Sequence, residues 1–153
     1  MLHTLKTRQF IKSDLNTVWR FISSPKNLAL ITPAYMGFNI LDKDLLNEEM
    51  YAGQIIEYTV SPVLGIKLHW VTEITHVQDL VYFVDEQRMG PYAFWHHRHF
   101  LKEVPGGIEM TDVVHYKLPL GILGRILNLL FVRHKLKEIF DYRFEKLNEI
   151  FNK

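Results

Sequence analysis

Three histidines crowded into four consecutive positions, His96, His97 and His99, are the most distinctive chemical feature of the sequence. A histidine side chain can serve near neutral pH as a hydrogen-bond partner, a general base or a metal ligand. Trp95 stands directly before them, and Asp85 and Asp112 are the nearest aspartates on either side along the chain. The chemistry open to this group depends on which of these side chains share a face.

Alternation along extended strands predicts that face. Residues 92–103 are expected to form a strand, in which Trp95, His97 and His99 point to the same side. The predicted strands on either side, 80–87 and 108–118, add five residues to this face: Phe83, Asp85, Gln87, Asp112 and Tyr116. We expect this to be the interior face of the sheet.

The turn between the predicted strands 92–103 and 108–118 sets their register. A two-residue turn centred on Pro105 and Gly106 places residue 99 opposite 112, 97 opposite 114 and 95 opposite 116. A three-residue Pro-Gly-Gly loop would instead place His99 opposite Val113. We favour the first register, because Pro-Gly suits the centre of a type II turn and because it pairs His99 with Asp112.

Four interpretations of this cluster remain open. It is a hydrogen-bonded network that fixes the sheet, or it orients the polar end of a bound ligand. In a third interpretation, His97 or His99 works with Asp112 as a general acid-base pair. His97 and His99 with Asp85 or Asp112 would also make a two-histidine, one-carboxylate metal set, but spacing alone is weak evidence. We expect no metal and no cofactor.

The elements that must position these residues follow from periodicity. Strands are predicted at about 2–12, 37–42, 51–60, 66–76, 80–87, 92–103 and 108–118. Two short helices come after the first strand, one capped by Ser13 and one spanning Pro25 to Ile31. The short connections predict an antiparallel meander. The fold class is therefore α+β, with about seven strands and one long helix.

That long helix is predicted over about the last 32 residues. Its apolar stripe consists of Ile126, Leu129, Val132, Leu136, Ile139, Phe140, Leu147 and Ile150. Arg143 interrupts the stripe, and we expect it to reach the rim and form a surface ion pair. Pairing with Asp85, Glu73 or a ligand carboxylate is the alternative. A curved sheet around one helix often leaves an apolar cavity between them.

Composition narrows the functional class. A net charge of +1 gives no reason to expect nucleic acid, and the absence of cysteine excludes disulfides and thiolate chemistry. The N-terminus lacks an apolar signal core, so a cytoplasmic location is expected. Leu118 to Gly124 is an apolar segment that either contacts a membrane transiently or simply connects strand to helix.

Several segments carry a resemblance to a known family. These are 27–33 (NLALITP), 70–74 (WVTEI), 83–92 (FVDEQRMGPY), 95–99 (WHHRH), 112–121 (DVVHYKLPLG) and 139–143 (IFDYR). Together they resemble the SRPBCC superfamily, which includes START lipid-transfer domains, birch-pollen-allergen-like proteins and polyketide cyclases/dehydrases. The bacterial ligand-binding members of the superfamily are the most similar group, and the resemblance covers residues 1–153 as a single domain.

The resemblance implies a helix-grip fold with an internal pocket for a hydrophobic small molecule. The residues expected at the pocket are Trp70, Phe83, Asp85, Gln87, Trp95, His97, His99, Asp112, Tyr116, Phe140 and Arg143. Binding or transport of a lipid, polyketide or other apolar ligand is the favoured function. A cyclase or dehydratase is the alternative, and either a monomer or a homodimer is compatible with the sequence.

Overall fold

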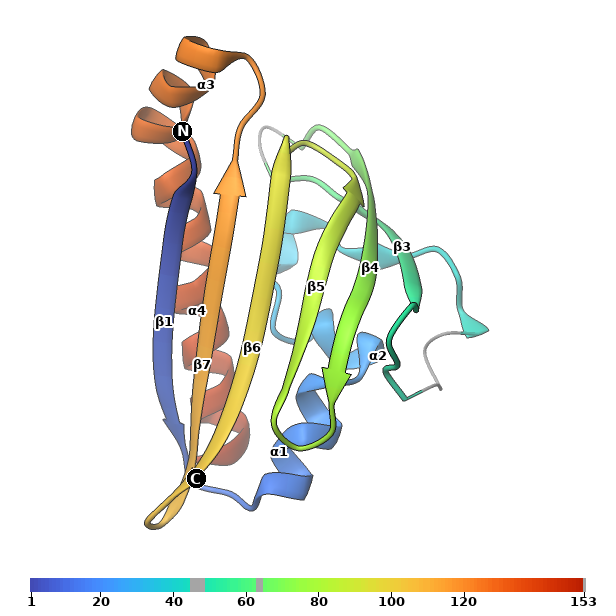
Figure 1. Cartoon of the computed structure of the whole chain (residues 1–153), viewed down its shortest axis with the longest axis vertical. Helices are drawn as coiled ribbons and strands as arrows, with labels where there is room; N and C mark the ends of the chain where they lie inside the picture. Colours follow the sequence, from blue (N-terminus) through green and yellow to red (C-terminus); the bar gives the residue numbers. More distant parts are fainter. Residues whose placement is uncertain (45–48, 63–64, 153) are drawn as a thin grey trace.

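The structure is a computed structural model that describes residues 1–44, 49–62 and 65–152. Seven antiparallel strands form one sheet in the order β1-β7-β6-β5-β4-β3-β2, and the C-terminal helices lie against it (Figure 1). The strands are β1 His3–Ile11, β2 Asn39–Ile40, β3 Ile55–Val60, β4 Leu68–Gln78, β5 Tyr82–Met89, β6 Phe94–Val104 and β7 Gly107–Lys117. The main helices are α1 Leu15–Ile22, α2 Pro25–Leu28, α3 Gly121–Leu127 and α4 Arg133–Phe151. The predicted α+β class and its order of elements are confirmed.

A capping hydrogen bond determines where the first short helix, α1, begins. Asp14 is its N-cap, and the Asp14 carboxylate accepts a hydrogen bond from the Thr17 amide at 2.9 Å. The prediction that Ser13 caps this helix is therefore wrong by one residue. Val18 and Ile22 form the buried face, so α1 packs against the sheet as a short brace.

The hairpin of β6 and β7 has the predicted two-residue turn, and His99 lies opposite Asp112 as expected. Gly106 has a φ of 87°, which is the left-handed conformation that a type II turn requires at its third position. The next residue allows β1 to approach closely, since a Cβ atom on Gly107 would lie 2.3 Å from the Ile11 carbonyl oxygen. Local turn chemistry therefore fixes the register of the strands that carry the histidines.

The C-terminal helix is not uniform. A π-helical turn, Asn128–Val132, joins α3 to α4. The middle of the predicted apolar stripe is buried, at Leu136, Phe140 and Leu147. Its N-terminal part is not: Ile126 and Leu129 are exposed, because α3 extends past the end of the sheet and has nothing to cover (Figure 1).

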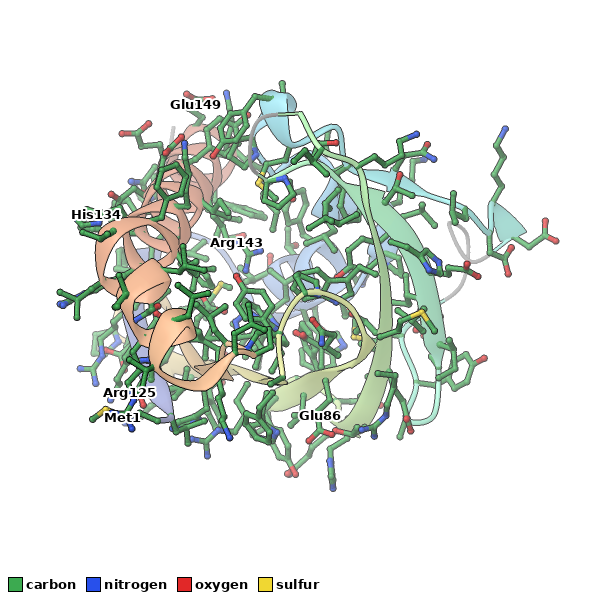
Figure 2. The ribbon with its side chains drawn as sticks, turned by 90° about the horizontal axis from the view of Figure 1, so that it is seen from above. Met1, Glu86, Arg125, His134, Arg143 and Glu149 are labelled. Carbon is green, nitrogen blue, oxygen red and sulfur yellow. The ribbon has the colours of Figure 1, made fainter. Side chains whose placement is uncertain are left out.

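The core is divided into three apolar clusters. One joins α1 to the sheet around Val18 and Phe83, a second packs Phe140 against β7, and a third surrounds Trp70. Register shifts in the β4–β5 pairing increase the local curvature, so that the sheet wraps around α4 (Figure 2). No helix in the described ranges is both long and apolar enough to cross a bilayer.

Candidate functional site

A cavity of about 180 Å³ lies between the sheet and α4, and residues of all three apolar clusters contribute to its wall. It is lined by eight of the residues singled out from the sequence: Trp70, Phe83, Asp85, Trp95, His97, His99, Phe140 and Arg143. These come from four elements, β4, β5, β6 and α4, that are separated along the chain. The wall therefore exists only in the folded protein.

The other three predicted residues lie beside the cavity rather than on its wall. Asp112 is buried behind the two histidines, and the Tyr116 hydroxyl donates a hydrogen bond to the Asn128 side chain at 2.9 Å. Gln87 accepts a hydrogen bond from the backbone N–H of Tyr92 at 3.1 Å and donates one to its carbonyl at 2.7 Å. Gln87 therefore fixes the β5–β6 connection in place.

Sequence reasoning missed the aromatic residues that complete the wall. Tyr58 and Tyr92 line the cavity, and their rings lie 5.9 Å and 5.5 Å from the ring of Trp70. Trp95 contacts Trp70 edge-on at 5.4 Å. Alternation along 51–60 would have placed Tyr58 on the face of Ile56 and Val60. Alternation along the predicted strand 92–103 would have placed Tyr92 on the face opposite Trp95, but β6 begins only at Phe94, so Tyr92 does not follow that alternation.

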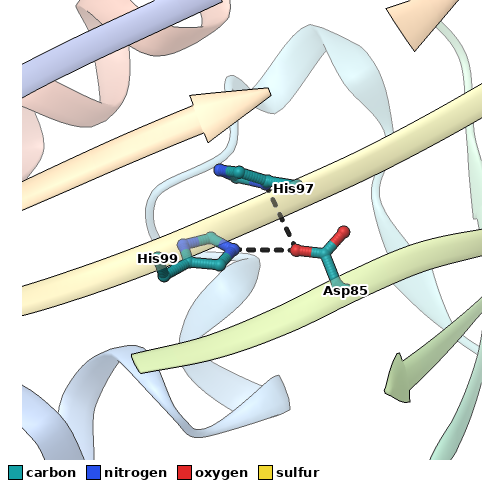
Figure 3. A group of neighbouring side chains, drawn as sticks. All are labelled: Asp85, His97 and His99. Carbon is teal, nitrogen blue, oxygen red and sulfur yellow. Dashed lines mark hydrogen bonds and ion pairs between the residues drawn. The ribbon is translucent and has the colours of Figure 1, made fainter. Parts of the chain in front are cut away.

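Two histidines and two aspartates form a closed ring in the cavity wall, here called the His–Asp ring (Figure 3). Asp85 Oδ2 contacts His97 Nδ1 at 3.2 Å and His99 Nε2 at 2.8 Å. On the other side, Asp112 Oδ1 contacts His97 Nε2 at 3.0 Å and His99 Nδ1 at 2.8 Å. Only the first of these two sides, Asp85 with both histidines, is drawn in Figure 3. The predicted pair of His99 and Asp112 is thus one edge of a four-membered arrangement.

Two of the four contacts of the His–Asp ring have hydrogen-bond geometry, His97 Nε2 with Asp112 Oδ1 and His99 Nε2 with Asp85 Oδ2. The other two are close contacts between a histidine nitrogen and a carboxylate oxygen, at ion-pair distance. One hydrogen on each imidazole is enough for the two hydrogen bonds, and each further hydrogen offsets one carboxylate charge.

The contacts of the His–Asp ring shift the pKa values of three of its members. Burial alone would raise the pKa of Asp85 and of Asp112, but the charges of His97 and His99 and their hydrogen bonds hold both pKa values well below the ordinary range. Burial alone would lower the pKa of His97, whereas Asp85 and Asp112 raise it above its usual value. Asp85 is further held by the Trp95 indole, whose N–H donates to its second oxygen at 3.1 Å.

Asp85, His97 and His99 are also the described residues whose geometry could hold a metal ion, because one ligand atom from each lies within 4.8 Å of the others. Asp112 would then contact both histidines from behind, as partners of metal-bound imidazoles commonly do. These histidine nitrogens and the Asp85 carboxylate already contact one another within the His–Asp ring, so an ion would have to replace those contacts.

Arg143 lies at the cavity, as the family resemblance implied, and not at the rim of the molecule. It is 9% exposed and lies in the interior between α4 and the sheet (Figure 2). Its guanidinium carbon lies 4.9 Å from the centre of the Phe140 ring. The expected surface ion pair at the rim is therefore wrong, because α4 turns this position towards the cavity rather than towards solvent.

No protein-family model matches the chain, and no curated protein matches it. Solved structures do. A protein from Thermus thermophilus has a TM-score of 0.69 at 16% identity, covering 96% of this chain and 95% of that one. A Chromobacterium violaceum protein has a TM-score of 0.68 at 15% identity, covering 98% of both chains.

Ara h 8.0201, a birch-pollen-allergen-like protein, has a TM-score of 0.64 at 12% identity, and 97% of this chain and 99% of that chain are covered. At such identities the similarity concerns the fold. The chain therefore has the helix-grip fold that its sequence predicted.

Proposed function

We propose that the protein binds a small apolar molecule in the cavity between the sheet and α4, as a receptor or carrier. The observation that supports this most directly is the cavity itself, about 180 Å³ with a largely apolar and aromatic wall. Leaving such a volume empty costs on the order of 4 kcal/mol relative to a filled core, at roughly 24 cal/mol per Å³. A ligand would recover much of that free energy.

The volume sets the size of the ligand. An apolar cavity of about 150 Å³ can hold one benzene molecule. A space of about 180 Å³ therefore suits a compact ligand of one or two rings, or a short branched chain, in the conformation described. Trp70, Trp95 and Tyr92 line it and pack against one another with ring centres 4.9 to 5.5 Å apart, and such a group of aromatic rings favours an aromatic ligand.

Binding is better supported than acid-base catalysis by the way the His–Asp ring is closed. All four imidazole nitrogens of His97 and His99 already contact carboxylate oxygens. A general base needs a free lone pair within reach of the proton it removes. A cyclase or dehydratase reaction would therefore require one of these contacts to open when substrate enters.

Native mass spectrometry and calorimetric titration with naphthalene-sized ligands test the proposal. We expect the wild type to bind, and Ile139→Phe, which adds a ring at the cavity wall, to bind at least about tenfold more weakly. Ile150→Phe is the matched control, because Ile150 lies on the same helix and does not line the cavity. Absence of binding to the wild type, or equal weakening by both variants, would contradict the proposal.

We further propose that a carrier of this kind meets its ligand at an anionic membrane surface, through the exposed segment 120–131, here called the apolar cap. Ile122, Leu129 and Leu130 are 74%, 68% and 70% exposed, and Leu120, Leu123 and Phe131 are also exposed. This segment projects beyond the sheet (Figure 1). Contiguous apolar exposure on this scale marks an interaction surface.

The charges around the apolar cap favour anionic lipid as its partner. Arg125 lies within it, Lys117 precedes it, and Arg133, Lys135 and Lys137 follow it, while no acidic residue occurs between Asp112 and Glu138. Each basic residue near an anionic bilayer contributes about 1 kcal/mol. Apolar side chains flanked by basic ones are typical of segments that lie in the membrane interface.

Cosedimentation with vesicles tests this contact. We expect binding to phosphatidylserine-containing vesicles, weaker binding to phosphatidylcholine alone, and loss of binding in the double variant Ile122→Ser/Leu130→Ser. The double variant Ile55→Ser/Ile66→Ser is the control, since both residues are exposed and lie outside the apolar cap. A wild type that ignores vesicles and instead forms dimers through the cap would show that the partner is a second copy.

A further inference from the structure

Arg143 is a buried cation whose charge has no visible counterpart. Its side chain lines the cavity, and its Nε has no hydrogen-bond partner in the described part of the chain. The Arg143 guanidinium lies over the ring of Phe140. A cation–π contact of this kind offsets only part of the cost of removing a guanidinium from water.

The carboxylates that could have paired with Arg143 are engaged elsewhere. Asp85 contacts His97 and His99. Glu73 pairs with Arg88 at 2.5 Å on the outer side of the sheet. Neither carboxylate lies within 4.0 Å of the Arg143 guanidinium in the part of the chain that the structure describes.

The remaining polar groups on the wall do not pair with Arg143 either. The carboxylates of Asp85 and Asp112 are held by His97 and His99. Burial raises the pKa of Tyr58 far above its ordinary value, and the hydrogen bond with Thr72 and the charge of Arg143 offset this only in part. Burial likewise raises the pKa of Tyr92. Both phenols stay uncharged at neutral pH, so no described group of the wall forms an ion pair with Arg143.

From this unpaired charge we propose that the ligand carries a carboxylate that pairs with Arg143, so that the bound molecule is a small apolar or aromatic carboxylic acid. This inference rests on the proposed binding function and specifies its ligand class. A planar guanidinium matches a carboxylate with two parallel hydrogen bonds. A single arginine in a cavity of about 180 Å³ suits a monoanion better than the larger and more highly charged phosphate group.

The proposal also orients the ligand. Its carboxylate would lie against α4 at Arg143, and its apolar body would extend along Trp70, Trp95 and Tyr92 on the opposing wall. The His–Asp ring would present a polar surface beside it. Charge at one end and aromatic contact along the body would together exclude hydrocarbons and basic amines.

Titration calorimetry with two matched probes, 2-naphthoate and 2-naphthalenemethanol, tests the proposal. The probes have nearly the same shape and differ in charge. We expect the wild type to bind 2-naphthoate about 10- to 100-fold more tightly, the range expected for a desolvated charged hydrogen-bonded pair. Arg143→Gln should abolish this preference while binding of the alcohol is retained. Arg133→Gln removes the same charge from an exposed site on α4 and should leave the preference intact.

The outcomes separate this inference from the function on which it rests. If neither probe binds the wild type, the cavity-binding function itself fails. If both probes bind equally well, the function stands and the carboxylate assignment is wrong. The wild-type comparison needs no variant, so poor folding of Arg143→Gln would not prevent this decision. If Arg133→Gln also loses the preference, the effect is one of net charge and the assignment to Arg143 is overturned.

Discussion

The His–Asp ring predicts how the stability of the protein depends on pH. His97 has a raised pKa in the folded state, because Asp85 and Asp112 outweigh the effect of burial. In the unfolded chain a histidine has a pKa of about 6.5. A raised folded pKa stabilises fully below that value, and the stabilisation is lost as pH rises through the folded pKa. The loss amounts to at most about 1.4 kcal/mol per pH unit, and it occurs between about pH 6.5 and the folded pKa.

Replacement of His97 isolates its pH-dependent contribution to the free energy of unfolding. His97→Gln removes the titrating group and breaks two contacts of the ring, and should cost about 3–5 kcal/mol of unfolding free energy at about pH 5.5. At about pH 8 the wild type has lost at least part of the contribution of the proton, so the difference should be smaller than at about pH 5.5. Urea unfolding followed by tryptophan fluorescence measures both values. His96→Gln is the control, because His96 lies on the opposite face of β6 and contacts Glu86.

A difference between wild type and His97→Gln that stays constant over this pH range would refute the reasoning. It would mean that the ring does not hold the additional proton on His97. NMR titration of the His97 ring in the wild type gives the same answer without a variant. A resonance that reports deprotonation of His97 near pH 6 would contradict the raised pKa of this residue.

Three further predictions follow from buried groups. Arg143→Met should raise the unfolding free energy of the ligand-free protein by about 1–2 kcal/mol in chemical denaturation, because it removes an unpaired buried cation; a loss of stability would indicate a structural partner. Gly107→Ala should lower the melting temperature by several degrees, equivalent to about 1–3 kcal/mol, since its Cβ would clash with the Ile11 carbonyl. An unchanged melting temperature would mean that β1 can move away. Elemental analysis of protein purified without a histidine tag should find less than about 0.1 equivalent of transition metal, because an ion would have to replace contacts within the His–Asp ring. A full equivalent that survives dialysis would identify the ring as a metal site.

The β6–β7 hairpin shows how much of the site local sequence determines. Pro105 and Gly106 restrict the turn, the turn fixes the register, and the register pairs His99 with Asp112. The position of Asp85 in the ring could not be obtained in this way. It depends on the connection between β5 and β6, whose geometry is set by the two hydrogen bonds of Gln87 to Tyr92. Such a contact leaves no periodic signal in the sequence.

Two predictions about the C-terminal helix were wrong for a different reason: that Arg143 forms a surface ion pair, and that the whole apolar stripe is buried. Both assumed that an apolar stripe is buried along its length and that a charged residue interrupting it reaches water. The sheet is shorter than the run of helices, so Leu129 is exposed although it belongs to the stripe. Arg143 is buried although it is charged, because it faces a cavity. The point at which the sheet ends and the space left by the cavity are properties of the tertiary structure. Hydrophobic periodicity in the sequence cannot predict them.

The two sides of the cavity differ in what holds them. The His–Asp ring links three adjacent strands through Asp85, the two histidines and Asp112. These strands cannot move apart without breaking the contacts between the histidines and the carboxylates. The opposite side is formed in part by α2, one turn long, and by the short segment around Met36. Such segments have little of their own to keep them in place and can shift by a few ångströms at small cost. Selectivity should therefore be strict for the polar end of a ligand and tolerant of the size of its apolar body. Related molecules of different width should then compete for the same cavity.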